Sequence, residues 1–194
     1  MKKTTISEMN RLTVEEFHDA RKMPLVIVLD DVRSLHNVGS VFRTADAFRA
    51  EAIYLCGITA TPDDVKDADG NMLKQCSLKA SQEIHKTALG AENSVTWKYF
   101  PSAMDALQSL RQEGYTILGV EQCHDSTMLG DFVPDASCKG YAVVLGNEVK
   151  GVHQEVIDSC DGCLEIPQYG TKHSLNVSVT GGIIIWHFAS HLIG

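Results

Sequence analysis

The chain has 194 residues, of which 44% are hydrophobic and 22% are charged, and its net charge is −8. This length suits one good-sized core, and the balanced composition excludes a disordered or fibrous protein. The N-terminus is polar and charged, so we expect no secretory signal. The most apolar run, 177–193, is shorter than the roughly 20 residues of a bilayer span. We therefore expect a cytoplasmic protein without a membrane segment.

The charges are unevenly distributed along the chain. Residues 1–50 carry eight basic and seven acidic side chains, so the acidic excess lies in the remainder. Phosphate contacts need Lys and Arg, and an acidic protein at first argues against a nucleic-acid partner. Arg33 and Arg43 could nevertheless form a local basic surface on an acidic body.

Cysteine and histidine spacing gives no metal motif. The six cysteines are scattered, which is typical of reduced thiols rather than of a disulfide framework. Cys160 and Cys163 form a lone C-x-x-C pair without a second pair at zinc-ribbon spacing. His187 and His191 lack the glutamate of an HExxH motif. We expect no metal centre.

In chain order, the pattern predicts alternating helices and strands. Thr13 and Glu16 have the spacing of a capping box and open a short helix that Pro24 ends. The run 25–29 is continuously apolar, as in a buried parallel strand, and 37–50 has helical spacing with Asn37 as a candidate N-cap. Further strands are expected at 52–56, 95–100, 116–120, 141–145 and 162–166, and further helices at 103–112, 153–159 and from 177 onward.

This alternation predicts an α/β domain with a mostly parallel sheet flanked by helices. Residues 57–94 are the least regular part, with Pro62, an Asp-rich turn and scattered lysines. A long irregular segment is usually either a functional loop or a mobile one, and both interpretations apply here.

The polar loop 166–173 runs into Ser174-Leu175-Asn176 at the start of the terminal helix. Ser and Asn are favoured at helix starts because their side chains accept hydrogen bonds from the first free backbone N–H groups. The same N–H groups can hold an anion or another acceptor. Taken alone, this segment is equally consistent with a plain helix cap and with a ligand site.

Three polar, glycine-containing segments each follow an expected strand: 30–43, 145–152 and the terminal loop. Ligands of open α/β sheets bind at the carboxyl ends of the strands, so the three segments should converge on one crevice. A G-x-G-x-x-G fingerprint, a P-loop and a G-x-S-x-G elbow are all absent.

In order, spacing and strand context, these segments resemble the three motifs of the SpoU (TrmH-type) RNA ribose 2′-O-methyltransferases of the SPOUT class. Asn37-x-Gly39-x-x-x-Arg43 is similar to motif 1, Gly146-Asn147-Glu148-x-x-Gly151 to motif 2, and Ile166-Pro167 with Ser174-Leu175-Asn176-Val177 to motif 3. The resemblance implies the SPOUT fold with a deep C-terminal trefoil knot, S-adenosylmethionine (AdoMet) bound in the knot loops, and a homodimer with a composite active site. It divides the chain into an N-terminal helical extension (1–24) and a methyltransferase domain (25–194).

The resemblance also implies the residues of the site. The catalytic positions are Arg43, Asn37, Glu148, Ser174 and Asn176. The cofactor pocket is formed by Leu145, Gly146, Asn147, Gly151, Ile166, Pro167, Ser174 and Leu175. From the charge distribution, rather than from the resemblance, we expect the RNA contacts to be made by Arg33, Arg43, Arg11 and Lys22.

Two of these roles stay open at this point. Methylation of a ribose requires the 2′-hydroxyl to lose its proton, and the family proposal makes the motif 1 arginine, here Arg43, the base. A guanidinium ordinarily stays protonated far above neutral pH and accepts protons poorly, so this residue could instead stabilise the alkoxide and bind a phosphate. Glu148 could place the nucleotide together with Asn37, or it could cap a helix locally.

We therefore expect an AdoMet-dependent methyltransferase that modifies a ribose 2′-hydroxyl in tRNA or rRNA. The acidic chain carries no basic extension, which favours a small, locally read RNA such as a tRNA loop. One alternative is a non-catalytic paralogue that binds AdoMet or RNA and acts as an RNA assembly factor. Another is an α/β metabolic enzyme that does not bind RNA.

Overall fold

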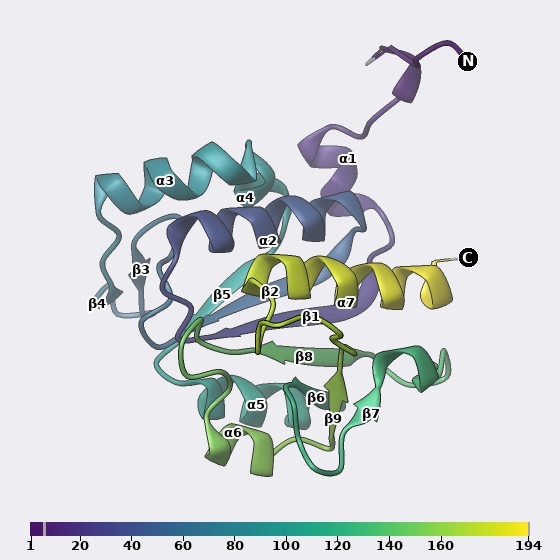
Figure 1. Cartoon of the computed structure of the whole chain (residues 1–194). Helices are drawn as coiled ribbons and strands as arrows, with labels where there is room; N and C mark the ends of the chain where they lie inside the picture. The colour runs from purple at the N-terminus through teal and green to yellow at the C-terminus, as the bar shows by residue number, and fades with distance from the viewer. Residues whose placement is uncertain (6, 194) are drawn as a thin grey trace.

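The computed structural model describes residues 1–5 and 7–193, and Figure 1 shows a central sheet with helices on both faces. The strands are β1 (Met23–Asp30), β2 (Ala50–Cys56), β3 (Val65–Lys66), β4 (Met72–Lys74), β5 (Trp97–Phe100), β6 (Thr116–Val120), β7 (Thr127–Met128), β8 (Tyr141–Leu145) and β9 (Gly162–Glu165). The helices are α1 (Val14–Asp19), α2 (Leu35–Ala47), α3 (Leu78–Ala88), α4 (Ala91–Ser94), α5 (Ala103–Gln112), α6 (Gln154–Asp158) and α7 (Val177–Leu192), with 3₁₀ turns at Ser7–Met9 and Leu129–Asp131.

The main sheet has seven strands in the order β5-β2-β1-β8-β6-β9-β7. Every neighbouring pair in it runs parallel, so the predicted α/β class with a parallel sheet flanked by helices is confirmed. The central strands β1 and β8 pair along their length, with Leu29 opposite Leu145. The segments that follow these two strands therefore begin side by side at the carboxyl edge of the sheet.

Both faces of the sheet are buried, and β1 shows how the sequence encodes this. Leu25, Ile27 and Leu29 enter a core shared with α2 and α7, and Val26 and Val28 enter the opposite core with α5 and α6. Because successive side chains of a strand point to opposite faces, a strand covered on both sides is apolar at every position. The expected helix layers thus cover both faces. Among the described residues, no helix combines the length and apolarity needed to cross a bilayer.

Residues 57–94 are more regular than expected. They contain the β3–β4 hairpin, α3 and α4, so the prediction of an irregular segment is wrong for most of this stretch. Helix α3 was not recognised because it has few apolar residues, of which only Ile84 and Ala88 are buried. It packs along α2, where Gly39 lets the two backbones approach closely.

The N-cap of α2 differs from the predicted one, and the N-cap of α7 is now identified. Ser34, not Asn37, is the N-cap of α2, because its hydroxyl accepts a hydrogen bond from the Asn37 N–H at 3.3 Å. The prediction of an Asn37 cap is therefore wrong, and Asn37 lies buried in the first helical turn. At α7, the cap is Asn176, whose side-chain oxygen accepts from the N–H groups of Ser178 and Val179 at 2.9 and 3.4 Å.

Replacing Gly39 with alanine should destabilise the fold. The new Cβ would lie 2.1 Å from the Thr87 hydroxyl oxygen and 2.3 Å from the Ile84 carbonyl oxygen, so α3 would have to move. Overpacking of this kind costs about 1–3 kcal/mol, which exceeds the gain of about 1 kcal/mol in helix propensity. Urea denaturation should show a net loss for Gly39→Ala. Gly130→Ala is the control, because its Cβ would meet nothing within 4 Å; equal stability of both variants would contradict the packing argument.

Candidate functional site

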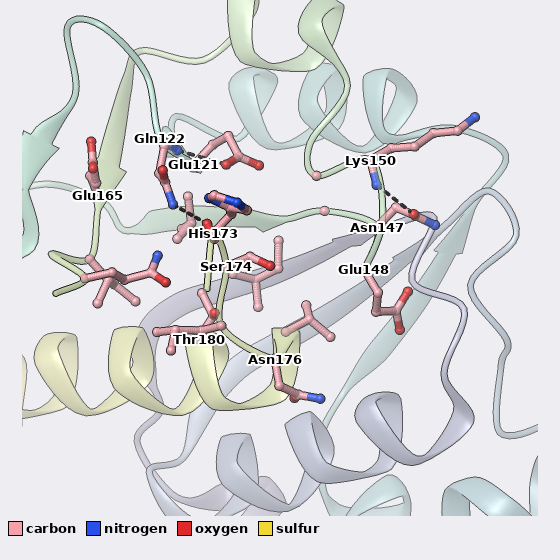
Figure 2. Close-up of a pocket in the computed structure, with 18 of the residues that line it drawn as sticks. Glu121, Gln122, Asn147, Glu148, Lys150, Glu165, His173, Ser174, Asn176 and Thr180 are labelled. Atoms are coloured by element: carbon pink, nitrogen blue, oxygen red, sulfur yellow. Dashed lines mark hydrogen bonds between the residues drawn. The ribbon is translucent and has the colours of Figure 1, made fainter. Parts of the chain in front are cut away.

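A cavity of about 540 Å³ lies at the carboxyl ends of β6, β8 and β9, beside the loop that leads into α7 (Figure 2). This volume is in the range of sites for small molecules. The lining consists of Val120, Glu121 and Gln122 after β6, 145–151 after β8, Leu164, Glu165, Ile166 and Gln168 around the end of β9, and 173–177 with Thr180 at the start of α7. The expected convergence of loops at the sheet edge is therefore present for the second and third segments.

The structure places the predicted residues in three groups. Those around the cavity are Leu145, Gly146, Asn147, Glu148, Gly151, Ile166, Ser174, Leu175 and Asn176. Pro167 and Asn37 do not line the cavity, although Asn37 contacts two residues that do. Arg43 lies on an exposed face of α2 and belongs to neither group.

A chain of side-chain hydrogen bonds joins the three motif segments. The Asn37 side-chain NH₂ donates to Glu148 Oε1 at 3.1 Å, and its Oδ1 accepts from the Asn176 NH₂ group at 3.1 Å. Asn176 in turn caps α7. Asn37 is 8% exposed, and a buried amide that lost either partner would cost about 1–3 kcal/mol. These bonds hold the start of α2, the β8 loop and the start of α7 in one arrangement.

Glu148 also accepts hydrogen bonds from the backbone at the start of α2. Its two carboxylate oxygens lie 2.9 Å from the N–H groups of Arg33 and Ser34. Partial burial raises the pKa of Glu148, but these backbone bonds and the Asn37 amide outweigh it and lower the pKa below its ordinary value. A carboxylate at a helix N-terminus is also favoured by the helix dipole. The local capping role left open for Glu148 is therefore present in the fold.

The β8 loop is a tight turn that Asn147 and two glycines shape. The Asn147 side-chain oxygen accepts from the N–H groups of Val149 and Lys150, and its NH₂ donates to the Asp31 carbonyl at 2.8 Å. The amide of Asn147 is therefore already engaged in holding the loop. A Cβ on Gly146 would lie 2.1 Å from the backbone of Gly151, so this close approach requires glycine.

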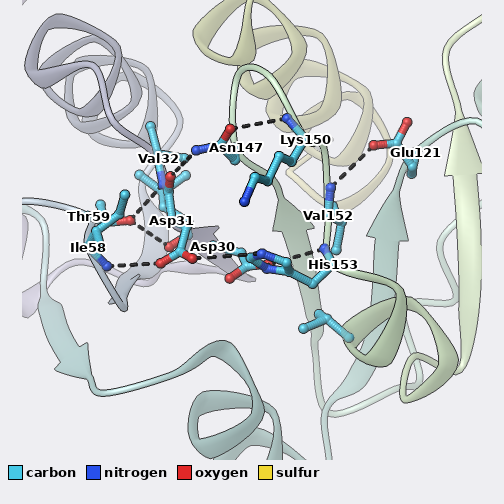
Figure 3. Close-up of polar contacts among 12 residues, drawn as sticks. Asp30, Asp31, Val32, Ile58, Thr59, Glu121, Asn147, Lys150, Val152 and His153 are labelled. Atoms are coloured by element: carbon cyan, nitrogen blue, oxygen red, sulfur yellow. Dashed lines mark hydrogen bonds and ion pairs between the residues drawn. The ribbon is translucent and has the colours of Figure 1, made fainter.

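A contact between His153, which follows the β8 loop, and Asp30 also ties this loop to the end of β1 (Figure 3). His153 Nδ1 lies 3.0 Å from the carboxylate of the buried Asp30, and the carboxylate of Asp31 accepts from the Ile58 N–H at 2.9 Å. Asp30, Asp31 and His153 offer ligand atoms within 4.8 Å of one another. The Asp30–His153 contact accounts for this grouping, and the expectation of no metal stays a prediction.

Sequence reasoning missed several polar residues of the cavity, among them Glu121, Gln122 and Glu165. Glu121 and Gln122 follow β6, and Glu165 ends β9. Gln122 donates from its NH₂ group to the His173 carbonyl at 2.7 Å and thereby ties the terminal loop to the β6 loop. None of the three belongs to a motif. Their position at or directly after the carboxyl ends of expected strands could have identified them, since ligands bind at that edge of the sheet.

The predicted RNA contacts differ in their surroundings. The side chains of Arg11, Arg33 and Arg43 are exposed and make no hydrogen bond or ion pair with any residue of 1–5 and 7–193. Lys22 is different, because its ammonium donates to the carbonyls of Phe17, His18 and Ala20 at the end of α1. Burial lowers the pKa of Lys22, and nearby Arg49 adds to this effect. The three arginines are thus free for an anionic partner, while the Lys22 ammonium is engaged.

The fold and the cavity define an α/β protein with a ligand pocket at the carboxyl edge of a parallel sheet. The model of the SpoU rRNA Methylase family matches residues 24–186, and the chain belongs to this family. The family predicted from the three motifs is therefore confirmed.

Named relatives and solved structures agree with this assignment. The chain is 30% identical over 162 residues to a 23S rRNA (guanosine-2′-O-)-methyltransferase of Neisseria meningitidis serogroup B, covering 84% of this chain and 56% of that protein. It is 26% identical over 180 residues to a tRNA (guanosine(18)-2′-O)-methyltransferase of Thermus thermophilus, covering 93% of this chain and 81% of that protein. The structure of an AdoMet-bound rRNA methyltransferase from Sinorhizobium meliloti has the same fold, with a TM-score of 0.72 at 23% identity, over 92% of this chain and 61% of that chain. The chain thus spans little more than half the length of the Neisseria protein.

Replacing Glu148 with glutamine should cost stability in a pH-dependent way. A carboxylate whose pKa is lowered by folding stabilises the protein above the unfolded-state pKa, and this contribution is lost as the pH falls through the folded-state pKa. The ordinary pKa of a glutamate side chain is 4.5. We expect Glu148→Gln to lose about 1 kcal/mol at neutral pH, at the low end for a charged hydrogen bond because the residue is exposed. The difference from the wild type should shrink as the pH falls below 4.5.

The measurement is the free energy of unfolding in urea at several pH values. Glu155→Gln is the matched control, since this exposed carboxylate on α6 makes no side-chain hydrogen bond with the described residues. It should change stability by less than about 0.5 kcal/mol at neutral pH. A Glu148→Gln difference that is constant across pH would show that the carboxylate charge does not stabilise α2.

Proposed function

We propose that the chain is an AdoMet-dependent methyltransferase that modifies a ribose 2′-hydroxyl of tRNA or rRNA. The observation that carries this proposal is the joining of Asn37, Glu148 and Asn176, one from each motif, beside a single cavity. The Neisseria and Thermus relatives are named as 2′-O-methyltransferases of rRNA and tRNA, and the Sinorhizobium structure is titled as AdoMet-bound. That the protein works in the cytoplasm stays a prediction from the sequence.

The residues of the cavity fit AdoMet. Leu145, Ile166 and Leu175 offer apolar surface for an adenine. Gly146 and Gly151 also line the cavity, and they are packed so closely against neighbouring atoms that neither position has room for a side chain. When bound, AdoMet would supply an electrophilic methyl group on a cationic sulfur. The residues of this chain would hold it, exclude water and orient the ribose.

We also propose the trefoil knot and the domain division at residues 24 and 25. In support of the knot, β9 lies in the sheet between β6 and β7, although it follows both in sequence. The chain after β9 then returns past the β6 loop, where Gln122 donates to His173, before it enters α7. In support of the boundary, the family match begins at residue 24.

We propose that two copies form the working unit. Val179, Trp186 and Ile193 of the α7 segment are 50%, 60% and 39% exposed, so an apolar stripe runs along the outer side of a helix whose inner side is already buried. The Trp186 ring packs edge-on against Phe48 with centroids 5.6 Å apart and extends this surface onto α2. A helix that is apolar all round is normally buried, and a second copy would cover it.

The position of Arg43 supports a composite site. It does not line the cavity of its own chain, and it has neither a carboxylate partner nor a burying environment among the described residues. A second copy could bring its Arg43 to this cavity. An exposed, unpaired guanidinium suits the stabilisation of a developing alkoxide and the gripping of a phosphate better than the abstraction of a proton. We propose the electrostatic role.

The test uses labelled AdoMet and in vitro transcribed tRNA and rRNA, followed by mapping of the 2′-O-methyl position. Arg43→Ala should lower methyl transfer by about 100-fold or more, which is typical when a transition-state charge partner is removed. Its affinity for AdoMet should stay within about twofold, because the proposed contacts of Arg43 are to the ribose oxygen and a phosphate of the RNA and not to AdoMet. Arg43→Lys should retain more activity than Arg43→Ala if charge is what matters.

Subunit mixing tests the composite arrangement. Arg43→Ala and Asn176→Ala chains, each inactive alone, should regain activity when mixed and allowed to exchange, because one site of the mixed dimer is then intact. No recovery would place Arg43 in its own chain's site. Wild-type protein that binds AdoMet and RNA but transfers no more label than Arg43→Ala would favour the non-catalytic assembly factor. Failure to shift tRNA in a gel at low salt would favour a small-molecule enzyme.

Replacing Trp186 with aspartate should break the dimer. A charge on an apolar interface has no partner there, so association should weaken by several kcal/mol. Sedimentation velocity should show a dimer for the wild type and a monomer for Trp186→Asp. Leu78→Asp, which changes a 76% exposed leucine on α3, is the control and should stay dimeric. A wild-type monomer at micromolar concentration would contradict the proposed assembly.

A further inference from the structure

The cavity carries more negative than positive charge. Its lining residues include three glutamates, Glu121, Glu148 and Glu165, and among the described lining residues only Lys150 is a lysine or arginine. Figure 2 shows the Lys150 side chain pointing away from the other labelled side chains. The motif residues do not explain this excess, because Glu121 and Glu165 lie outside all three motifs.

The three carboxylates have different partners. Glu148 faces the positive end of α2 and accepts hydrogen bonds from two backbone N–H groups there. Glu121 accepts from the N–H groups of Gln122 and Val152 at 2.9 and 3.3 Å, and Glu165 accepts from the Ser126 hydroxyl at 2.5 Å. Neither Glu121 nor Glu165 forms an ion pair with any described residue, and both are half-buried.

Half-buried carboxylates without a cationic partner favour a cationic ligand. Unit charges interact more strongly at a partly desolvated site than in bulk water, and a cleft lined by one sign of charge concentrates the field. No described cationic residue pairs with Glu121 or Glu165, so their negative charge is available to attract a positively charged ligand.

We propose that Glu121 and Glu165 make the pocket select AdoMet over S-adenosylhomocysteine by charge. This inference rests on the proposed function. AdoMet has a sulfonium, an ammonium and a carboxylate, so it carries one net positive charge. S-adenosylhomocysteine has a neutral thioether instead and no net charge. The two molecules otherwise share the adenine, ribose and amino-acid groups, so contacts to those groups bind both equally, and a pocket distinguishes them only by the charge on the sulfur and by the methyl group.

Selection of AdoMet by its charge would favour release of the product after methyl transfer. Loss of the methyl group leaves the sulfur neutral, so the attraction to Glu121 and Glu165 weakens when the product forms. The product then leaves more readily and competes less with fresh AdoMet. Glu121 also reaches the motif 2 loop through Val152, which places this charge directly beside Gly151.

The test is isothermal titration calorimetry of the full chain with AdoMet, S-adenosylhomocysteine and sinefungin, which carries an ammonium near the place of the sulfonium. The variants are Glu121→Gln, Glu165→Gln and their combination. Glutamine keeps an acceptor for the Val152 N–H and the Ser126 hydroxyl. Glu155→Gln on α6 removes the same charge away from the cavity and serves as the control. Thermal unfolding of each variant checks the fold.

We expect the double variant to bind AdoMet and sinefungin about tenfold more weakly, which corresponds to about 1.4 kcal/mol, and S-adenosylhomocysteine less than about threefold more weakly. The Glu165→Gln single variant should change in the same direction. Equal weakening for all three ligands would assign the carboxylates to a group that the ligands share and overturn the proposal, as would no weakening at all. A wild-type chain that binds none of them would overturn the proposed function itself.

Discussion

The rest of the site depends on the hydrogen-bonded chain from Glu148 through Asn37 to Asn176. Asn37 is more than 100 positions from both Glu148 and Asn176 in sequence, and the parallel pairing of β1 with β8 brings Asn37 and Glu148 together. Each amide both donates and accepts, so neither Asn37 nor Asn176 could be replaced by a carboxylate or an alkyl group without leaving a partner unsatisfied. Glu148 binds the backbone just before α2 and Asn176 caps α7, so the helices that cover one face of the sheet and the loops of the site are held by one set of bonds.

Many polar residues of the motifs are therefore structural as well as functional. Asn147 uses its whole amide to hold its own loop and to reach the end of β1, and Gly146 is required because backbone passes 2.1 Å from where its Cβ would lie. Motif 1 also has structural roles. Gly39 allows α3 to pack closely against α2, and Asn37 holds Glu148 of the pocket without lining the pocket itself. The groups that remain available to a ligand are apolar surface, backbone and the carboxylates outside the motifs.

The proposed division of the site between two copies agrees with the position of the exposed residues. Arg33 and Arg43 belong to the α2 segment and face solvent, while the cavity opens at the ends of β8 and β9. The apolar stripe of α7, which runs through Trp186, lies against the same helix through Phe48. Assembly through this stripe would place basic residues of one copy near the pocket of another, so an acidic chain could present positive charge to RNA only where it is needed.

The sequence by itself determined the α/β class, six of the seven strands of the main sheet and the family, because a strand buried on both faces is apolar throughout and the motifs lie at fixed places after strands. It did not reveal the short strand β7, helix α3, which has few apolar residues, or the Ser34 cap, since both serine and asparagine can start a helix. Only the tertiary structure decided that Glu148 binds the backbone before α2, that Lys22 is engaged by carbonyls, and that Glu121 and Glu165 line the cavity. The reason is physical. Local patterns of apolar residues in the sequence indicate which side chains are buried. The partners of a polar side chain come from segments that are distant in sequence and that only the folded sheet brings together.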